Sequence, residues 1–172
     1  DFTGNDNTDA VFVNYSGAGT VSIADSTVHL AAIADTLGSS SAPVSLSLTN
    51  VTAVTDDVPC MRLDHAGVTS MTSSSCSLVT SDGFCQGAVS IGTGSLQMRG
   101  DTLSGFDCAA NVAGAVDVTA PQASDTTPLI DLGTSGDPGG NVFTGNDIDV
   151  AVHYGTASRS LTMDAVGNTW SA

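Results

Sequence analysis

The stretch Gly139–Trp170, GGNVFTGNDIDVAVHYGTASRSLTMDAVGNTW, decides the fold we expect. Its pentapeptide FTGND at 143–147 recurs letter for letter at 2–6. Each copy runs into an alternating apolar segment that ends in tyrosine, Val150–Tyr154 late in the chain and Val11–Tyr15 early in it. A chain that shows its opening again near its close is built from repeats.

Two families of short segments alternate along the chain and keep apolar residues at i and i+2, the period of a half-buried strand. Successive members of a family lie mostly 20 to 30 residues apart, so about two strands and their turns fit into each repeat. The first family is Val11/Val13, Met61/Leu63, Val89/Ile91, Val116/Val118, Ile130/Leu132 and Val150/Val152. The second family is Val21/Ile23, Leu46/Leu48, Thr69/Met71, Leu96/Met98 and Leu161/Met163.

The turns after the two families differ in composition. Polar residues that can bond a turn backbone follow the second family, and stacked repeats would line them up into a ladder. Glycines follow the first family and predict a bend with positive φ at that corner. The polar residues are Asp25, Asn50, Ser74, Asp101 and Asn168, and the glycines are Gly17, Gly67, Gly92, Gly133 and Gly155.

These patterns predict an all-β fold, a single parallel β-solenoid domain over residues 1–172 with about six to seven coils. Strands of three to five residues cannot bury a face alone, whereas stacked coils share one interior column of Val, Ile, Leu and Met. An antiparallel sandwich also has short alternating strands and stays as the alternative. The recurrence of similar segments in the same order favours the solenoid.

Composition limits the classes of partner. Lys and Arg total 3 against 18 Asp and Glu, which gives a net charge of −15 and disfavours nucleic acids and anionic membranes. Lysine is absent, and Ser, Thr, Gly, Asn and Ala dominate, as suits strands and tight turns more than helices. No apolar run is long enough for membrane insertion.

The four cysteines fall within one central part of the chain and favour disulfides in an oxidising, extracellular compartment. Cys60–Cys85 and Cys76–Cys108 are the expected pairs, because about one repeat separates the members of each. Four buried free thiols are the alternative. The cysteines form no CxxC motif and the histidines are dispersed, so the sequence does not predict a zinc site.

Three runs near the end of the chain resemble a known family. They are Leu129–Thr134, Asp137–Phe143 and Asp164–Trp170, and they are similar to the closing coils of secreted bacterial right-handed parallel β-helix proteins of the DUF1565 type. The resemblance implies a right-handed, pectate-lyase-shaped β-helix at a cell surface, in a family of which many members have no known activity. It covers about the last 45 residues, and the entry helix and cap of the family have no counterpart here.

Pairs of aspartates are the candidates for chemistry. Carboxylates next to backbone carbonyls in a turn can hold Ca²⁺, and Asp147 with Asp149 is the best placed pair, because i and i+2 on a strand share a face. No EF-hand or other calcium-loop pattern is present, so solvated turn aspartates are the alternative and no metal is assigned. The other pairs are Asp6/Asp9 and Asp56/Asp57.

A polysaccharide lyase would need a base near such carboxylates, and the chain offers Arg62, Arg99 and Arg159. Arg62 and Arg99 stand on outward positions of strands, where a salt bridge to the neighbouring coil is the competing explanation. His65 beside Asp64 invites a triad, but no GxSxG motif accompanies it. We therefore assign no catalytic residue.

Aromatic residues mark the ends of the expected stack. Trp170, the sole tryptophan, is expected to cover the open core of the last coil. Tyr15 and Tyr154 occupy equivalent repeat positions and either pack at coil edges or stack on sugars. Solenoid ends expose strand edges and apolar core, so Phe2–Tyr15 could stack on the Trp170 end of another copy.

A row of small polar residues suggests one further binding mode. The outward positions of the second family are Ser22, Ser47, Ser70, Gln97 and Thr162, an interrupted version of the ladder that an ice-binding solenoid would need.

The sequence therefore predicts a non-catalytic extracellular β-helix module with a structural or adhesive role at a cell surface or in a fibre. Its expected partners are further copies stacked end to end, other surface proteins or glycans, and no cofactor is needed, with Ca²⁺ the one candidate. The alternatives are a carbohydrate-active, polysaccharide lyase-like enzyme on a pectate-lyase-type β-helix and an ice-binding solenoid.

Overall fold

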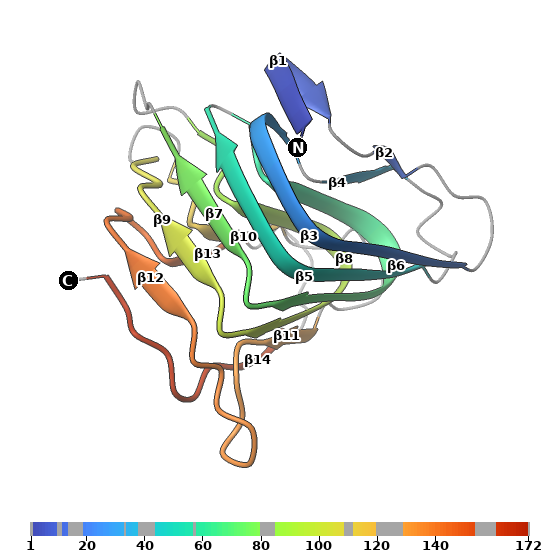
Figure 1. Cartoon of the computed structure of the whole chain (residues 1–172). Coiled ribbons are helices and arrows are strands. Elements are labelled where there is room, and N and C mark those ends of the chain that lie inside the picture. The colour runs from blue at the N-terminus through green and yellow to red at the C-terminus, as the bar shows by residue number, and fades with distance from the viewer. Residues whose placement is uncertain are drawn as a thin grey trace.

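The structure, a computed structural model, is built from parallel β-strands (Figure 1). It describes residues 2–9, 12–13, 19–32, 34–37, 44–56, 58–79, 85–108, 112–119, 129–153 and 161–171. Within these ranges the chain forms no helix, and so no helix that could cross a membrane. Every strand pair in them is parallel, which contradicts the antiparallel sandwich.

The strands follow one another along the whole chain. They are β1 (Phe2–Asp9), β2 (Phe12–Val13), β3 (Gly19–Ala32), β4 (Ala34–Leu37), β5 (Val44–Thr55), β6 (Met61–Thr72), β7 (Ser75–Leu78), β8 (Val89–Arg99), β9 (Thr102–Ser104), β10 (Val116–Thr119), β11 (Leu129–Asp131), β12 (Val142–Thr144), β13 (Val150–His153) and β14 (Thr162–Asp164).

Both predicted families of segments form ladders of paired strands. Met61, Val89, Val116 and Val150 of the first family align across β6, β8, β10 and β13, and we call this row the Met61 ladder. The Leu46 ladder aligns the second family across β3, β5, β6, β8, β11 and β14. Its members are Val21, Leu46, Thr69, Leu96, Ile130 and Met163.

Ile130/Leu132 was assigned to the wrong family. Ile130 pairs with Leu96 and Met163, so β11 continues the Leu46 ladder and not the Met61 ladder. Both families have the same two-residue period, and the period alone cannot tell one from the other.

A third ladder went unrecognised in the sequence. It runs through β3, β5, β7, β9 and β12, and we call it the Ala53 ladder. Three of its strands, β7, β9 and β12, bury only one residue each, too few to show a period. Its aligned residues are Val28, Ala53, Cys76, Leu103 and Phe143, with Phe2 of β1 opposite Val28.

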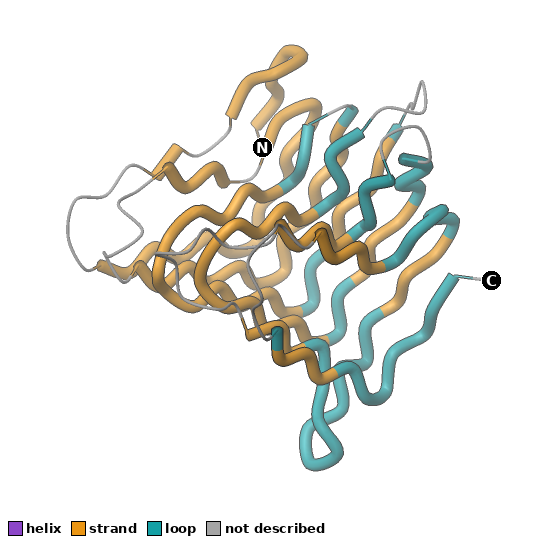
Figure 2. Tube along the Cα trace, turned by 180° about the vertical axis from the view of Figure 1, so that it is seen from behind, coloured by secondary structure: helices purple, strands orange, loops and turns teal. Residues whose placement is uncertain are grey.

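The sheet curls because long strands belong to two ladders at once. β5 takes part in both the Leu46 and Ala53 ladders, and β6 and β8 in both the Met61 and Leu46 ladders. Successive passes of the chain lie side by side when seen from behind (Figure 2). The result is a parallel sheet bent into a half-barrel, a shape consistent with a β-helix.

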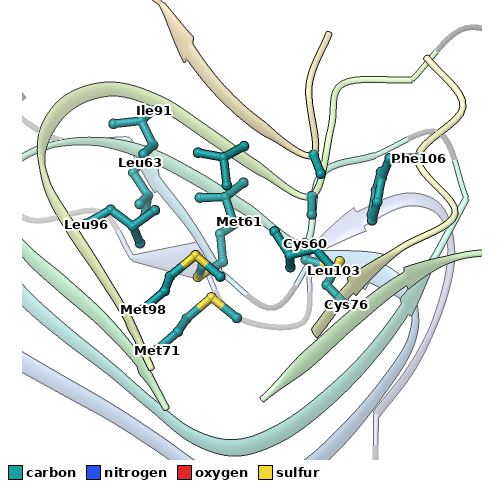
Figure 3. Packing of buried hydrophobic residues seen from close by; sticks show 14 of the residues in the cluster. Cys60, Met61, Leu63, Met71, Cys76, Ile91, Leu96, Met98, Leu103 and Phe106 are labelled. Carbon is teal, nitrogen blue, oxygen red and sulfur yellow. A yellow bond between two sulfur atoms is a disulfide. The ribbon is translucent and has the colours of Figure 1, made fainter. Parts of the chain in front are cut away.

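The concave side of the sheet holds the core. Its apolar side chains converge from all three ladders (Figure 3), and residues such as Met61, Leu96 and Leu103 are fully buried. In β8 the burial alternates strictly up to Thr93 and then shifts by one residue, because the strand turns from one ladder into the next. Alternation of buried residues therefore restarts at every bend.

The corner at which positive φ recurs lies between the Leu46 and Ala53 ladders, whereas after the Met61 ladder, among the described residues, Gly94 of β8 has a positive φ (84°). At the recurring corner one residue in each pass has φ between 49° and 79°: Asp25, Asn50, Ser73, Gly100, Gly140 and Gly167.

The prediction of positive φ is wrong for Gly67 and Gly92 and holds for Gly133, whose φ is 132°. Gly17 and Gly155 lie outside the described residues. Gly67 is needed for space instead, since a Cβ there would collide with the backbone of Val44.

Candidate functional site

A ladder of polar side chains follows the positive-φ corner, as the sequence predicted for Ser74, Asp101 and Asn168. The other two expected members, Asp25 and Asn50, lie at the corner itself, where Asn50 Nδ2 donates to Asp25 Oδ1 at 2.7 Å. We call Ser74, Asp101, Asn141 and Asn168 the corner ladder. Each accepts a bond from the backbone N–H of the preceding pass: Val51 N to Ser74 Oγ at 3.1 Å, Ser74 N to Asp101 Oδ1 at 2.7 Å, Asp101 N to Asn141 Oδ1 at 3.0 Å and Asn141 N to Asn168 Oδ1 at 3.2 Å.

Asn141 was not among the expected members, although it is the most engaged of them. Its Nδ2 donates its two hydrogens in shared bonds to three acceptors, Met98 O and Leu132 O, both at 3.2 Å, and Asn168 Oδ1 at 2.9 Å. It lies in the long gap between Leu96 and Leu161, where no member of the second family was recognised. A buried amide with three such bonds ties neighbouring passes together.

Asp101 is the one ionisable group of the corner ladder, and it is 1% exposed. Burial raises its pKa to about 7, against the opposing effect of the N–H groups of Ser74 and Arg99, which donate to its two carboxylate oxygens. A buried carboxylate with a pKa near neutrality is a familiar mark of active sites. Here, however, both oxygens are occupied by the protein's own backbone.

Arg99 lies in a cluster of two aspartates on the outer side of the Leu46 ladder. Its Nη2 contacts both carboxylate oxygens of Asp131, at 2.9 and 3.0 Å, and its Nε donates to Asp137 at 2.8 Å. The bond with Asp131 raises the pKa of Arg99 and lowers that of Asp131. Both groups are held charged, which is the opposite of what a general base requires.

Arg62, the other described arginine, also bonds along the stack. Its Nη2 donates to Gln86 Oε1 at 2.8 Å. Arginines paired within the stack were the outcome expected for a structural protein. Arg159 lies outside the described residues, as does the side chain of His65, so the pair of His65 with Asp64 is not observed.

A carboxylate–imidazole pair was missed by sequence reasoning. His153 Nε2 of β13 lies 2.8 Å from Asp117 Oδ1 of β10. Desolvation raises the pKa of Asp117, and His153 opposes that rise. Ser90 of β8 is aligned with Asp117 on the side of β10 that faces away from β13. Across the three neighbouring strands the side chains therefore follow the order serine, aspartate, histidine. A nucleophilic triad needs the histidine in the middle, and this pair therefore does not form one.

The calcium candidates Asp147 and Asp149 lie in the turn before β13 and not on the strand. Asp149 accepts bonds from Asn146 Nδ2 at 3.0 Å and from Ser171 N at 2.8 Å, so both of its oxygens hold the local fold. No group of three metal-binding side chains occurs in the described part of the chain. The side chains of Asp6 and Asp9 and all of Asp57 fall outside it.

All four cysteines form disulfides, but the expected pairing was wrong. The bonds are Cys60–Cys76 and Cys85–Cys108, with Cα–Cα distances of 6.3 and 5.1 Å. Register is the reason. Val89 pairs with Met61, so Ala88, and not Cys85, lies beside Cys60 in the next pass. Leu103, and not Cys108, lies beside Cys76.

The C-terminal end of the stack is covered as expected of Trp170. Its ring stacks on Phe143, whose side chain is 1% exposed. Of the eight large hydrophobic residues that are exposed in the described part of the chain, five lie between 129 and 170, in its last passes: Leu129, Val142, Met163, Val166 and Trp170. Tyr15, Tyr154 and the side chain of Phe2 lie outside the described residues.

The outward row of the second family aligns as predicted through Ser22, Ser47, Ser70 and Gln97. It then continues through Asp131, not Thr162, because Thr162 pairs with Leu129.

Comparison with known proteins finds no match among family models, curated proteins or solved structures.

Proposed function

We propose that this chain is a right-handed parallel β-helix of about six to seven coils, each of which passes through the three ladders in turn, and a non-catalytic extracellular module. The observation that carries the proposal is the corner ladder: its side chains bond the backbone of the neighbouring pass, one after another. The resemblance of residues 129–170 to DUF1565-type proteins agrees with this proposal.

The bonding of the charged groups favours a structural role over a lyase. Arg99 is held by Asp131 and Asp137, and Asp149 by Asn146 and Ser171. A catalytic cluster keeps at least one such group available to substrate. The two disulfides are compatible with an extracellular protein.

The end of the stack provides the means of assembly. β14 pairs with β11 alone among the described strands, so its second edge is open to another strand. Met163 and Val166 beside that edge are 44% and 48% exposed. A second copy of the chain is the partner we propose, giving a structural or adhesive fibre.

Sedimentation velocity of a matched pair of variants tests the assembly. Val166→Ser removes an exposed methyl pair at the proposed interface, whereas Val68→Ser removes one of equal exposure (50%) from the outer side of β6, far from the end. Weaker association of Val166→Ser, with Val68→Ser unchanged, supports the proposal. Equal behaviour of both variants would contradict it.

A further inference from the structure

The outer surface of the Ala53 ladder differs from the rest of the sheet. Two columns of outward residues flank the buried column, one aligned residue from each strand. The first column is Thr27, Thr52, Ser75, Thr102, Val142 and Thr169, and the second is His29, Val54, Ser77, Ser104 and Thr144. We call these eleven residues the hydroxyl face, since eight of them are Ser or Thr.

The hydroxyl face has no carboxylate, lysine or arginine, although the chain carries 18 acidic residues. The other two ladders do not share this property. The outer side of the Leu46 ladder carries Arg99 and Asp131, and that of the Met61 ladder carries Arg62, Asp117 and His153. A strongly acidic molecule therefore presents one neutral face, which suits a partner without charge.

The spacing of the hydroxyl face is regular in two directions. Its strand pairs are parallel and continue without a shift of register from β3 to β12 (Figure 1). Neighbouring positions of the face are thus about 4.8 Å apart across strands and about 6.7 Å apart along each strand, and β7 and β9 carry a hydroxyl in both columns. Such a two-dimensional lattice matches a repeating surface better than it matches a single small molecule.

The chemistry of the face is that of alternating methyl and hydroxyl groups. Ser77 Oγ donates to Ala53 O at 3.5 Å, whereas the other seven hydroxyls have no side-chain hydrogen bond to the rest of the described chain. They are available to water, and the threonine and valine methyls between them order that water further. No Phe, Tyr or Trp side chain, the usual platform for a sugar ring, stands among the eleven residues.

From these observations we infer that the hydroxyl face binds the ordered water lattice of an ice surface. The sequence suggested such a row on the outer side of the Leu46 ladder, where Gln97 and Arg99 interrupt it. The structure places an uncharged array on the neighbouring ladder. This inference does not depend on end-to-end assembly, because one copy of the chain carries the whole face.

Capture of the protein by a slowly growing ice hemisphere tests the inference. Wild-type chain is expected to be enriched in the ice fraction, and Thr102→Lys, at the centre of the face, to fall to the level of a non-binding protein. Thr144→Lys near the end of the second column provides a second variant should Thr102→Lys not fold. Ser47→Lys is the matched control on the Leu46 ladder and is expected to be captured like wild type.

Exclusion of the wild-type protein from ice would overturn the inference. So would undiminished capture of correctly folded Thr102→Lys and Thr144→Lys. Sedimentation with crystalline cellulose or chitin, without capture by ice, would also overturn it and assign the face to a polysaccharide lattice.

Discussion

The rings of Trp170 and Phe143 stack face to face, with centroids 4.7 Å apart and planes inclined by 15°. Phe143 belongs to the Ala53 ladder, and Thr169 bridges to Val142, so Trp170 adds one more layer to the buried column. The column therefore ends in a large ring that is itself 41% exposed.

Trp170→Ala is expected to lower the free energy of unfolding by about 2–3 kcal/mol, because it removes the stack and bares Phe143. Trp170→Phe should lose about half of that. Urea unfolding followed by circular dichroism measures both. If Trp170→Ala were as stable as wild type, the ring would not be covering the core.

Asp101 predicts an unusual dependence of stability on pH. Its pKa is raised to about 7 in the folded chain from 3.8, so the folded state holds its proton more tightly than the unfolded state. This stabilisation is complete below pH 3.8 and is lost as the pH rises to about 7. The raised pKa of Asp117 changes stability with pH in the same direction. The lowered pKa of Asp131 changes stability only at pH values below the ordinary pKa range of an aspartate.

Asp101→Asn isolates this contribution. Between pH 4.5 and 8 the free energy of unfolding of wild type should fall by about 2–4 kcal/mol more than that of the variant, at about 1.4 kcal/mol per pKa unit. Urea denaturation at both pH values provides the comparison. Identical pH profiles for the two proteins would show that Asp101 does not titrate in this range.

Asn141→Ala should be among the most damaging polar substitutions in the chain. It removes three donated bonds and leaves the carbonyls of Met98 and Leu132 without this partner. We expect a loss of about 2–4 kcal/mol, since unsatisfied buried polar groups cost about 1–3 kcal/mol each. Thr144→Ala on the exposed surface is the control and should cost well under that; equal losses would refute the role of Asn141.

Much of the fold could be predicted from the sequence, and the corner ladder illustrates why. Ser74 and Asp101 each follow the last apolar residue of their segment, Met71 and Met98, by three residues, and Asn168 follows Met163 by five, so a recurring polar position was visible before its bonds were known. Asn141 was invisible because the residues before it diverge from the repeat. The Met61 and Leu46 ladders were predictable for a similar reason, as two-residue alternation recurs at a steady interval.

The third ladder and the disulfides were beyond this reasoning. Cys76, Leu103 and Phe143 are each the single buried residue of their strands, so no periodicity distinguishes these strands from turns. Counting one repeat between cysteines assumes that all coils have equal length, whereas the turns between ladders differ by several residues. The folded structure shows instead that Cys60 meets Cys76, 16 residues further along the same pass.

Val112 offers a stabilising substitution. It is a β-branched residue with φ of 59°, a conformation that costs about 1 kcal/mol or more for such a side chain, and it is 58% exposed. Val112→Gly should therefore raise the thermal midpoint. Val68→Gly, an equally exposed valine in an extended strand, should lower it. A decrease for Val112→Gly would contradict the strain at this position.

Light scattering coupled to size-exclusion chromatography tests the central proposal, that this chain is a structural module which assembles through its C-terminal end. The runs would span a range of protein concentration and of salt, with calcium and with EDTA. A net charge of −15 opposes association at low ionic strength, and the Debye length shrinks to about 8 Å at physiological salt. We predict masses that grow beyond 17.1 kDa with concentration and with salt, alike in calcium and EDTA. A constant 17.1 kDa under every condition would contradict the account.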